Sequence, residues 1–129
     1  MIAVDTNVLV RIVTNDDPAQ AKRAVRALHK QPVFVAKTVL LEMEWVLRYA
    51  YGLSRPVILD AMQRLLGLPN VEAEDSASVV QAIKWYAQGL DFADALHLAS
   101  SGHVRRFLTF DTRLAKRSAK LFGKPVTSP

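Results

Sequence analysis

The chain has no cysteine among its 129 residues, which excludes disulfide bonds and thiolate metal sites and suits a reducing compartment. It also has no uncharged run that approaches the ~18–20 apolar residues of a membrane span. A charge at Asp5 comes too early for a signal peptide. The chain has only five glycines and six prolines and is half hydrophobic, so disorder is not expected. We therefore expect one soluble domain over residues 1–129, located in the cytoplasm.

Acidic residues are scarce near the C-terminus. From Arg105 to Lys124 the only acid is Asp111, against seven basic residues, whereas the rest of the chain is close to neutral. This run could attract a polyanion such as nucleic acid. A solvated helix face that keeps the protein soluble explains it equally well.

Short apolar segments alternate with longer amphipathic ones along the whole chain. The segments predicted as strands or extended pieces are residues 1–4, 32–36, 70–74, 106–110 and 124–128. The first predicted helix begins at residue 6. The other predicted helices cover residues 17–31, 38–52, 54–68, 75–89, 91–102 and 111–123. Short strands separated by helices indicate an α/β fold with a parallel sheet covered on both faces. In such sheets ligands bind beyond the carboxyl ends of the strands.

Several aspartates lie where strands end or helices begin. Asp5 follows the first strand and Asp111 follows a late one, so both are expected to point into the same crevice. In the stretch DFADALHLA, Asp91 and Asp94 open an otherwise apolar helix. Each of these aspartates has a simpler interpretation, because Asp is a favoured helix cap and first-turn residue.

Glu42 is harder to explain by local structure. On a helical wheel it lies among apolar side chains, and no cation stands three or four residues away. A carboxylate in such a setting needs a compensating charge from elsewhere in the fold. The alternative is an exposed rim position. Glu44, by contrast, has Arg48 at i+4 and is predicted to form a surface ion pair.

Together these acids predict a metal site. Carboxylates gathered without matching cations repel one another, and they stay ionised together only if they hold a metal. An all-oxygen set suits Mg²⁺ or Mn²⁺, and such ions activate water and stabilise the leaving oxygen of a phosphodiester. The candidate metal ligands are Asp5, Glu42, Asp94 and Asp111, with Asp91 beside them.

At this point the sequence resembles a known family. The stretches AVDTNVLV, TVLLEMEWVL, DFADALHLA and LTFD look like the ordered acidic motifs of the PIN domain, with the closest likeness to the VapC toxins of type II toxin–antitoxin pairs. The resemblance implies a three-layer α/β/α sandwich with a central parallel sheet. It also implies a Mg²⁺- or Mn²⁺-dependent endoribonuclease that cleaves RNA with a metal-activated water. By motif, the catalytic acids correspond to Asp5, Glu42, Asp94 and Asp111.

The resemblance extends to residues around the acids. Small polar residues that orient the acids or their water correspond to Thr6, Asn7, Thr38 and Thr109. Asp91 falls where many of these toxins have a further acid, so the resemblance implies that Asp91 also binds the metal, directly or through a water molecule. Arg113 replaces an acid found in some PIN proteins, which puts a second metal in doubt and suggests a phosphate contact. The basic residues expected to contact RNA are Arg113, Lys116, Arg117 and Lys120.

The family also implies partners, namely a homodimer and a VapB-like antitoxin whose tail enters the active-site groove. The segment Trp45 to Leu53 is a candidate for partner contact, although core packing is the preferred interpretation for Trp45 and Val46. His97 is best explained as a helix-surface residue. Two alternatives stay open: a non-catalytic RNA-binding or scaffold protein of the same fold, and a receiver-like module, for which the paired acids after the first strand are missing.

Overall fold

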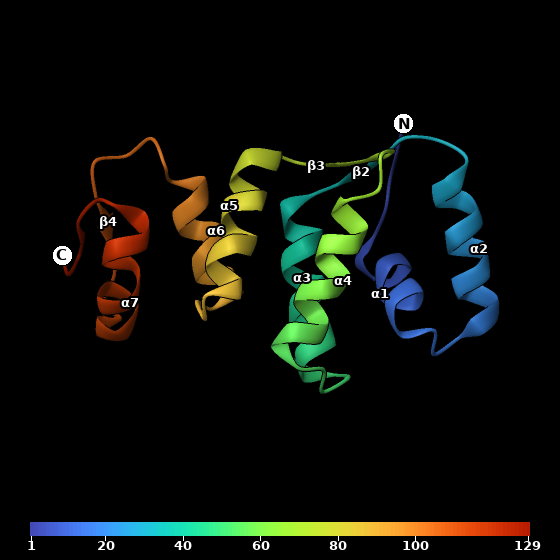
Figure 1. Cartoon of the computed structure of the whole chain (residues 1–129), viewed down its shortest axis with the longest axis horizontal. Coiled ribbons are helices and arrows are strands. Elements are labelled where there is room, and N and C mark those ends of the chain that lie inside the picture. Colours follow the sequence, from blue (N-terminus) through green and yellow to red (C-terminus); the bar gives the residue numbers. More distant parts are fainter. The chain divides into compact units, whose positions relative to one another are not determined.

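A computed structural model describes all residues 1–129 and contains two compact units, Met1–Ser76 and Ala77–Pro129 (Figure 1). The chain forms seven helices and five short strands. No helix is both long and apolar enough to cross a membrane.

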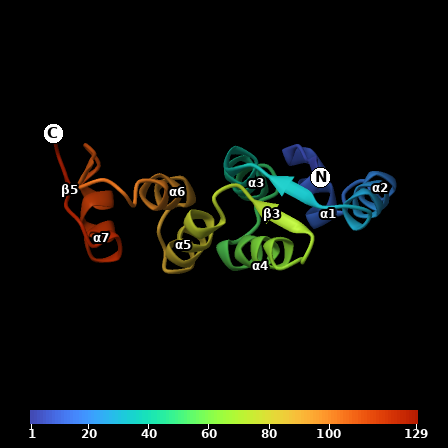
Figure 2. The same ribbon diagram turned by 90° about the horizontal axis from the view of Figure 1, so that it is seen from above.

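The first unit is built on a parallel sheet of three strands in the order β1-β2-β3. The strands are β1 (Ile2–Ala3), β2 (Val33–Val35) and β3 (Val71–Ala73), with Val33 paired to both Ile2 and Val71. The central strand supplies Val33 and Val35 to the core, and both are fully buried. Seen from above, β2 and β3 lie between α4 on one side and α1 and α3 on the other (Figure 2).

Local signals explain where the helices of this unit begin. The side chain of Asp5 caps α1 (Thr6–Thr14), and Asp17 caps α2 (Pro18–His29), with Pro18 in the first turn as predicted. Helix α3 (Lys37–Tyr49) and helix α4 (Arg55–Leu66) complete the unit.

Helix α3 presents two apolar faces, and the buried one contains Glu44. Leu40, Met43 and Leu47 are completely buried, and the Glu44 residue is only 1% exposed. The Glu44–Arg48 ion pair forms, with Nε 2.9 Å from Oε2, but its carboxylate is buried. The prediction of a surface ion pair was therefore wrong about its surroundings.

The other face of α3 is more open. Glu42 is exposed, which is the rim position that the sequence left as the alternative. Trp45 is 56% exposed and Tyr49 64%, and their rings contact each other at 5.5 Å between centroids. Core packing as the preferred interpretation was therefore wrong for Trp45. The Leu40 face of α3 is buried in the unit, where α1 and α4 contact the helix, and the aromatic face stays exposed.

The second unit contains three helices and a two-stranded parallel sheet. The helices are α5 (Ser76–Ala87), α6 (Phe92–Ser100) and α7 (Thr112–Phe122), and the strands are β4 (Phe107–Leu108) and β5 (Val126–Thr127). Helices α5 and α6 share an aromatic contact, in which Tyr86 and Phe92 meet edge to face at 5.3 Å. Trp85 beside them is also buried.

Every strand pair in the chain is parallel, and helices separate the strands along the sequence. The predicted α/β class with a parallel sheet is therefore confirmed.

Candidate active site

Asp5 stands just after β1 and begins α1. Its Oδ1 accepts a hydrogen bond from the backbone N–H of Thr6 at 2.7 Å, which holds the carboxylate at the helix start. Thr6 is buried, and its hydroxyl oxygen has no hydrogen-bond partner in the protein. A buried hydroxyl usually has a hydrogen-bond partner, so the Thr6 hydroxyl is available to a group that binds beside Asp5.

Asp5 and Glu42 line the same pocket of the first unit, so two of the predicted catalytic acids come together there. The pocket has a volume of about 200 Å³, and Thr6 and Asn7 also line it. Thr38, the remaining predicted polar residue of this unit, is exposed in the first turn of α3, one turn before Glu42. Both acids are exposed, and neither forms an ion pair with a Lys, Arg or His.

In the second unit Asp91 caps α6. Its Oδ2 accepts a hydrogen bond from the backbone N–H of Asp94 at 3.2 Å, so the simpler interpretation of Asp91 as a helix cap is confirmed. Asp94 is only partly exposed. Partial burial raises the pKa of the Asp94 carboxyl, and the nearby charges of Asp91 and Asp111 raise it further, while His97 acts in the opposite direction.

Asp111 caps α7 in the same unit. Its Oδ1 accepts hydrogen bonds from the backbone N–H groups of Arg113 at 2.9 Å and Leu114 at 3.0 Å. The Thr109 hydroxyl accepts a hydrogen bond from the backbone N–H of Asp111 at 3.0 Å, so Thr109 fixes the turn that presents this acid. Asp91 and Asp111 thus both lie within electrostatic reach of Asp94.

Each unit therefore carries its own group of predicted site acids, two in the first and three in the second. Neither unit by itself contains a group of three or more His, Asp or Glu side chains arranged to hold a metal ion. The donor atoms are all oxygens, which suits a hard divalent cation.

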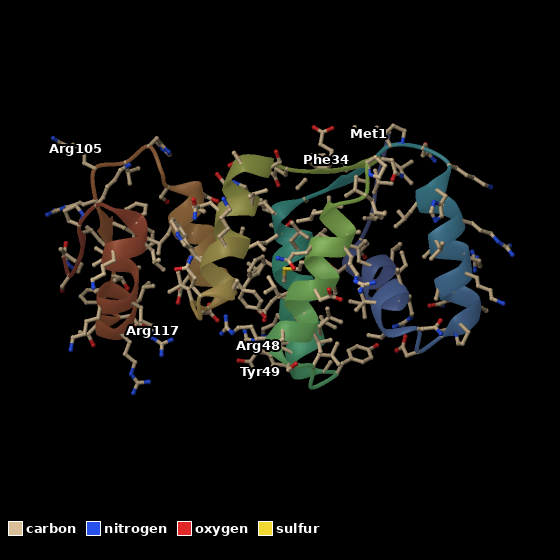
Figure 3. The ribbon with its side chains drawn as sticks, viewed as in Figure 1. Met1, Phe34, Arg48, Tyr49, Arg105 and Arg117 are labelled. Atoms are coloured by element: carbon tan, nitrogen blue, oxygen red, sulfur yellow. The ribbon has the colours of Figure 1, made fainter.

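The predicted RNA-binding residues form one stripe on α7. Arg113, Lys116, Arg117 and Lys120 are all exposed, and their spacing confines them to an arc of about 100° on the helix surface. Leu114 and Ser118 lie on the other side of α7 and are buried. Arg117 projects from α7 at the opposite end of the unit from Arg105 (Figure 3).

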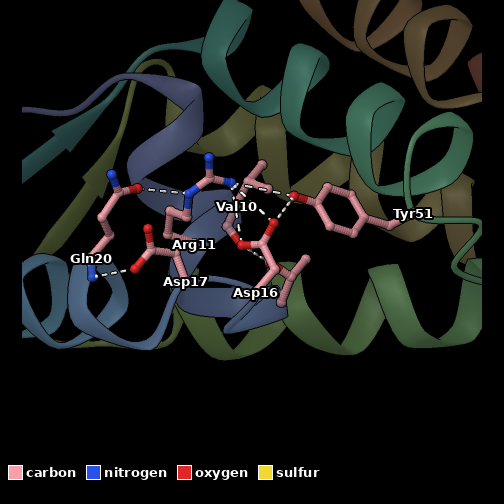
Figure 4. A network of polar contacts seen from close by, with 7 residues as sticks. Val10, Arg11, Asp16, Asp17, Gln20 and Tyr51 are labelled. Carbon is pink, nitrogen blue, oxygen red and sulfur yellow. Dashed lines mark hydrogen bonds and ion pairs between the residues drawn. The ribbon is translucent and has the colours of Figure 1, made fainter.

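A polar network at the end of α1 was not predicted from the sequence (Figure 4). Arg11 Nε donates to Gln20 Oε1 at 2.8 Å, and Arg11 Nη1 donates to Asp16 and to the Tyr51 hydroxyl at 3.3 Å. Arg11 and Tyr51 line the pocket that contains Asp5 and Glu42. No local signal marks this contact, because Arg11 and Tyr51 are 40 residues apart in the chain.

Comparison with known protein families identifies a match for this chain. A family model described as the PIN domain matches residues 2–120, a range that includes all of the acids described above. Comparison with curated proteins gives no match. PIN domains are generally metal-dependent nucleases that act on RNA, and divalent ions are their typical cofactors. Since the match covers nearly the whole chain, this protein belongs to the PIN domain family.

Proposed function

We propose that this protein is a metal-dependent endoribonuclease and that Asp5, Glu42, Asp94 and Asp111 are its catalytic acids. The observation that carries the proposal is the PIN-domain match over residues 2–120, because that range includes all four acids. Since the match also spans both compact units, we propose that they form one PIN domain.

The chemistry of these residues fits a divalent cation. All four donors are carboxylates without an ion-pair partner, and the Thr6 hydroxyl next to Asp5 is buried without a hydrogen bond. Mg²⁺ and Mn²⁺ both prefer such oxygen ligands. When bound, either ion supplies Lewis-acid stabilisation of phosphodiester charge and a lower pKa for an attacking water. Asp91 is held as a helix cap and supports Asp94 through its backbone.

The basic stripe on α7 carries the positive charge that would attract the negatively charged RNA backbone. Four exposed cations on one side of a helix attract a phosphate backbone without reading its sequence. We assign Arg113, Lys116, Arg117 and Lys120 to this role. Arg113 lies two residues after Asp111, so the stripe begins beside a catalytic acid.

We further propose that the nuclease is a VapC-type toxin with a VapB-like antitoxin and that it forms a homodimer. The sequence motifs around the four acids support this assignment. Exposed carboxylates without cations are natural receivers for an arginine from an antitoxin tail. Expression with and without the neighbouring open reading frame tests the toxin role, since growth arrest must be relieved by that neighbour. Light scattering of the purified protein tests the dimer.

Cleavage of RNA by the purified protein tests the catalytic proposal. We expect cleavage with Mg²⁺ or Mn²⁺ and none after EDTA treatment. Asp5→Asn and Asp94→Asn should each lower the rate by at least about 100-fold, because each removes a charge that contributes several kcal/mol to metal-assisted catalysis. Asp60→Asn is the matched control, since Asp60 is exposed on α4 and paired with Arg64.

The outcomes separate the alternatives. Full activity in Asp5→Asn or Asp94→Asn would contradict the assignment of the acids. RNA binding without any cleavage would favour a non-catalytic RNA-binding protein of the same fold.

A further inference from the structure

We infer that Arg11 is a substrate-positioning residue that binds a backbone phosphate of the RNA beside the scissile bond. The inference rests on the proposed nuclease function and adds a residue outside the acidic motifs. Its basis is the pocket in the first unit that Arg11 shares with Asp5 and Glu42.

The Arg11 guanidinium is held in place before any ligand arrives. Gln20 accepts from Nε at 2.8 Å, while Asp16 and Tyr51 accept from Nη1 at 3.3 Å. These partners come from the α1–α2 connection, from α2 and from the segment after α3, so three parts of the unit orient one side chain. A fixed guanidinium loses little conformational entropy when it binds an anion.

The same geometry leaves a binding edge open. Arg11 Nη2 makes no hydrogen bond within the protein, and Figure 4 shows this nitrogen without a partner. The N–H groups of Nη2 can donate to the oxygens of a phosphate group, and the guanidinium supplies the positive charge. Because the Arg11 side chain is 31% exposed, a phosphate can reach it from solvent.

The ion pair with Asp16 does not prevent Arg11 from binding a phosphate, because the Asp16 carboxylate also has other hydrogen-bond donors. The Tyr51 hydroxyl donates a short hydrogen bond to Asp16, and the Thr14 hydroxyl donates another at 3.0 Å. The Tyr51 hydrogen bond contributes most to lowering the pKa of Asp16, ahead of the charge of Arg11. The carboxylate therefore has other donors, and its two contacts with Arg11 are long.

Arg11 is displaced from Asp5 along helix α1. Arg11 lies six residues after Asp5, about 9 Å along the axis of α1. Because Arg11 is offset from Asp5 along the helix, we assign it a phosphate beside the cleaved one. A second, larger pocket also contains Asp5 and Arg11, and it extends to Gln20 and Arg23 on α2. The RNA strand therefore has room to continue along α1 and α2.

Binding of a short, labelled single-stranded RNA of mixed sequence in EDTA tests the inference without any cleavage. Arg11→Ala should weaken binding about tenfold, because it removes a charged hydrogen bond. It should also lower the salt slope of binding by about 0.7, the value for one phosphate contact on a single strand. Arg11→Lys should recover part of the affinity, since the charge stays but the planar group that the network holds in place is lost. Arg64→Ala, an equal charge change on the exposed surface of α4, is the matched control.

Asp16→Asn separates positioning from a merely structural role. Both Asp16→Asn and Arg11→Ala disturb the same network, but Asp16→Asn removes a competing negative charge and should strengthen RNA binding. An equal loss of affinity in both variants would overturn the inference, as would a loss below threefold in Arg11→Ala. Wild-type protein that neither binds nor cleaves RNA would overturn the proposed function together with the inference. Wild-type cleavage with unchanged binding by Arg11→Ala would overturn the inference alone.

Discussion

Two ion pairs of this protein share the same i,i+4 spacing and differ in burial. Glu44–Arg48 on α3 has a buried carboxylate, whereas Asp60–Arg64 on α4 is exposed at both side chains. Buried carboxylates depend on their partners far more than exposed ones do, because the solvent cannot replace a lost cation. The pairs therefore offer a matched comparison.

We predict that Arg48→Met lowers the free energy of unfolding by about 1–3 kcal/mol, because it removes one cation from the buried Glu44 carboxylate. Arg64→Met should change it by less than about 0.5 kcal/mol. Urea unfolding of both variants provides the measurement. Similar small losses in both would show that Glu44 is well supported without Arg48.

The raised pKa of Asp94 predicts a dependence of stability on pH. A carboxyl whose pKa is higher in the folded protein than its ordinary value of 3.8 destabilises the fold once it ionises. Asp94→Asn should therefore be more stable than wild type at neutral pH. The gain should stay below about 1 kcal/mol, because solvent screens this partly exposed group. The difference should vanish as the pH falls below the unfolded value.

Urea unfolding in EDTA across this pH range measures the effect. Asp60→Asn, whose carboxyl is exposed and paired, serves as the control. A wild-type protein that is more stable than Asp94→Asn at neutral pH without metal would contradict the prediction.

At the level of single residues, the sequence predicted functional groups better than their surroundings. Asp5 and Glu42 were selected by motif and do line one pocket. Arg11 is held in that pocket partly by Tyr51, and no sequence pattern near either residue predicts this contact. Local spacing can identify an acid at a strand end, but it cannot identify a partner 40 residues away.

Helix boundaries were predictable from their end residues. Asp17 and Pro18 begin α2, Asp111 begins α7, and Gly123 ends α7 in the left-handed conformation that favours glycine. The burial of α3 was not predictable in the same way, because two sides of this helix are apolar. Only the tertiary packing of α3 buries its Leu40 face and leaves its Trp45 face exposed.

The stripe on α7 allows a prediction about RNA binding. Replacing Arg113, Lys116 and Arg117 together by Gln should weaken binding to single-stranded RNA and lower the salt slope by about 2, since three phosphate contacts are lost. These side chains are exposed, so the fold should stay intact. Affinity measured at several salt concentrations checks the prediction. An unchanged slope would mean that the stripe faces away from the RNA.

For the whole molecule, metal binding should appear as added stability. A ligand that binds only the folded protein stabilises it by about 2.7 kcal/mol at 100 times its Kd. Saturating Mn²⁺ should therefore raise the Tm by several °C. Glu42→Gln and Asp94→Asn, one from each unit, should both reduce this rise, whereas Asp60→Asn should keep it. A rise that persists in both site variants would place the ion elsewhere.

The two tryptophans of the chain occupy opposite environments in different units. Trp45 on α3 is 56% exposed, whereas Trp85 on α5 is only 7% exposed. Each unit thus contains a built-in fluorophore of its own, one open to quenchers such as iodide and one shielded from them. In Trp85→Phe the remaining emission reports on the first unit alone, and in Trp45→Phe on the second. Stopped-flow fluorescence of this pair can reveal whether the units melt in one cooperative event, without any dye attached.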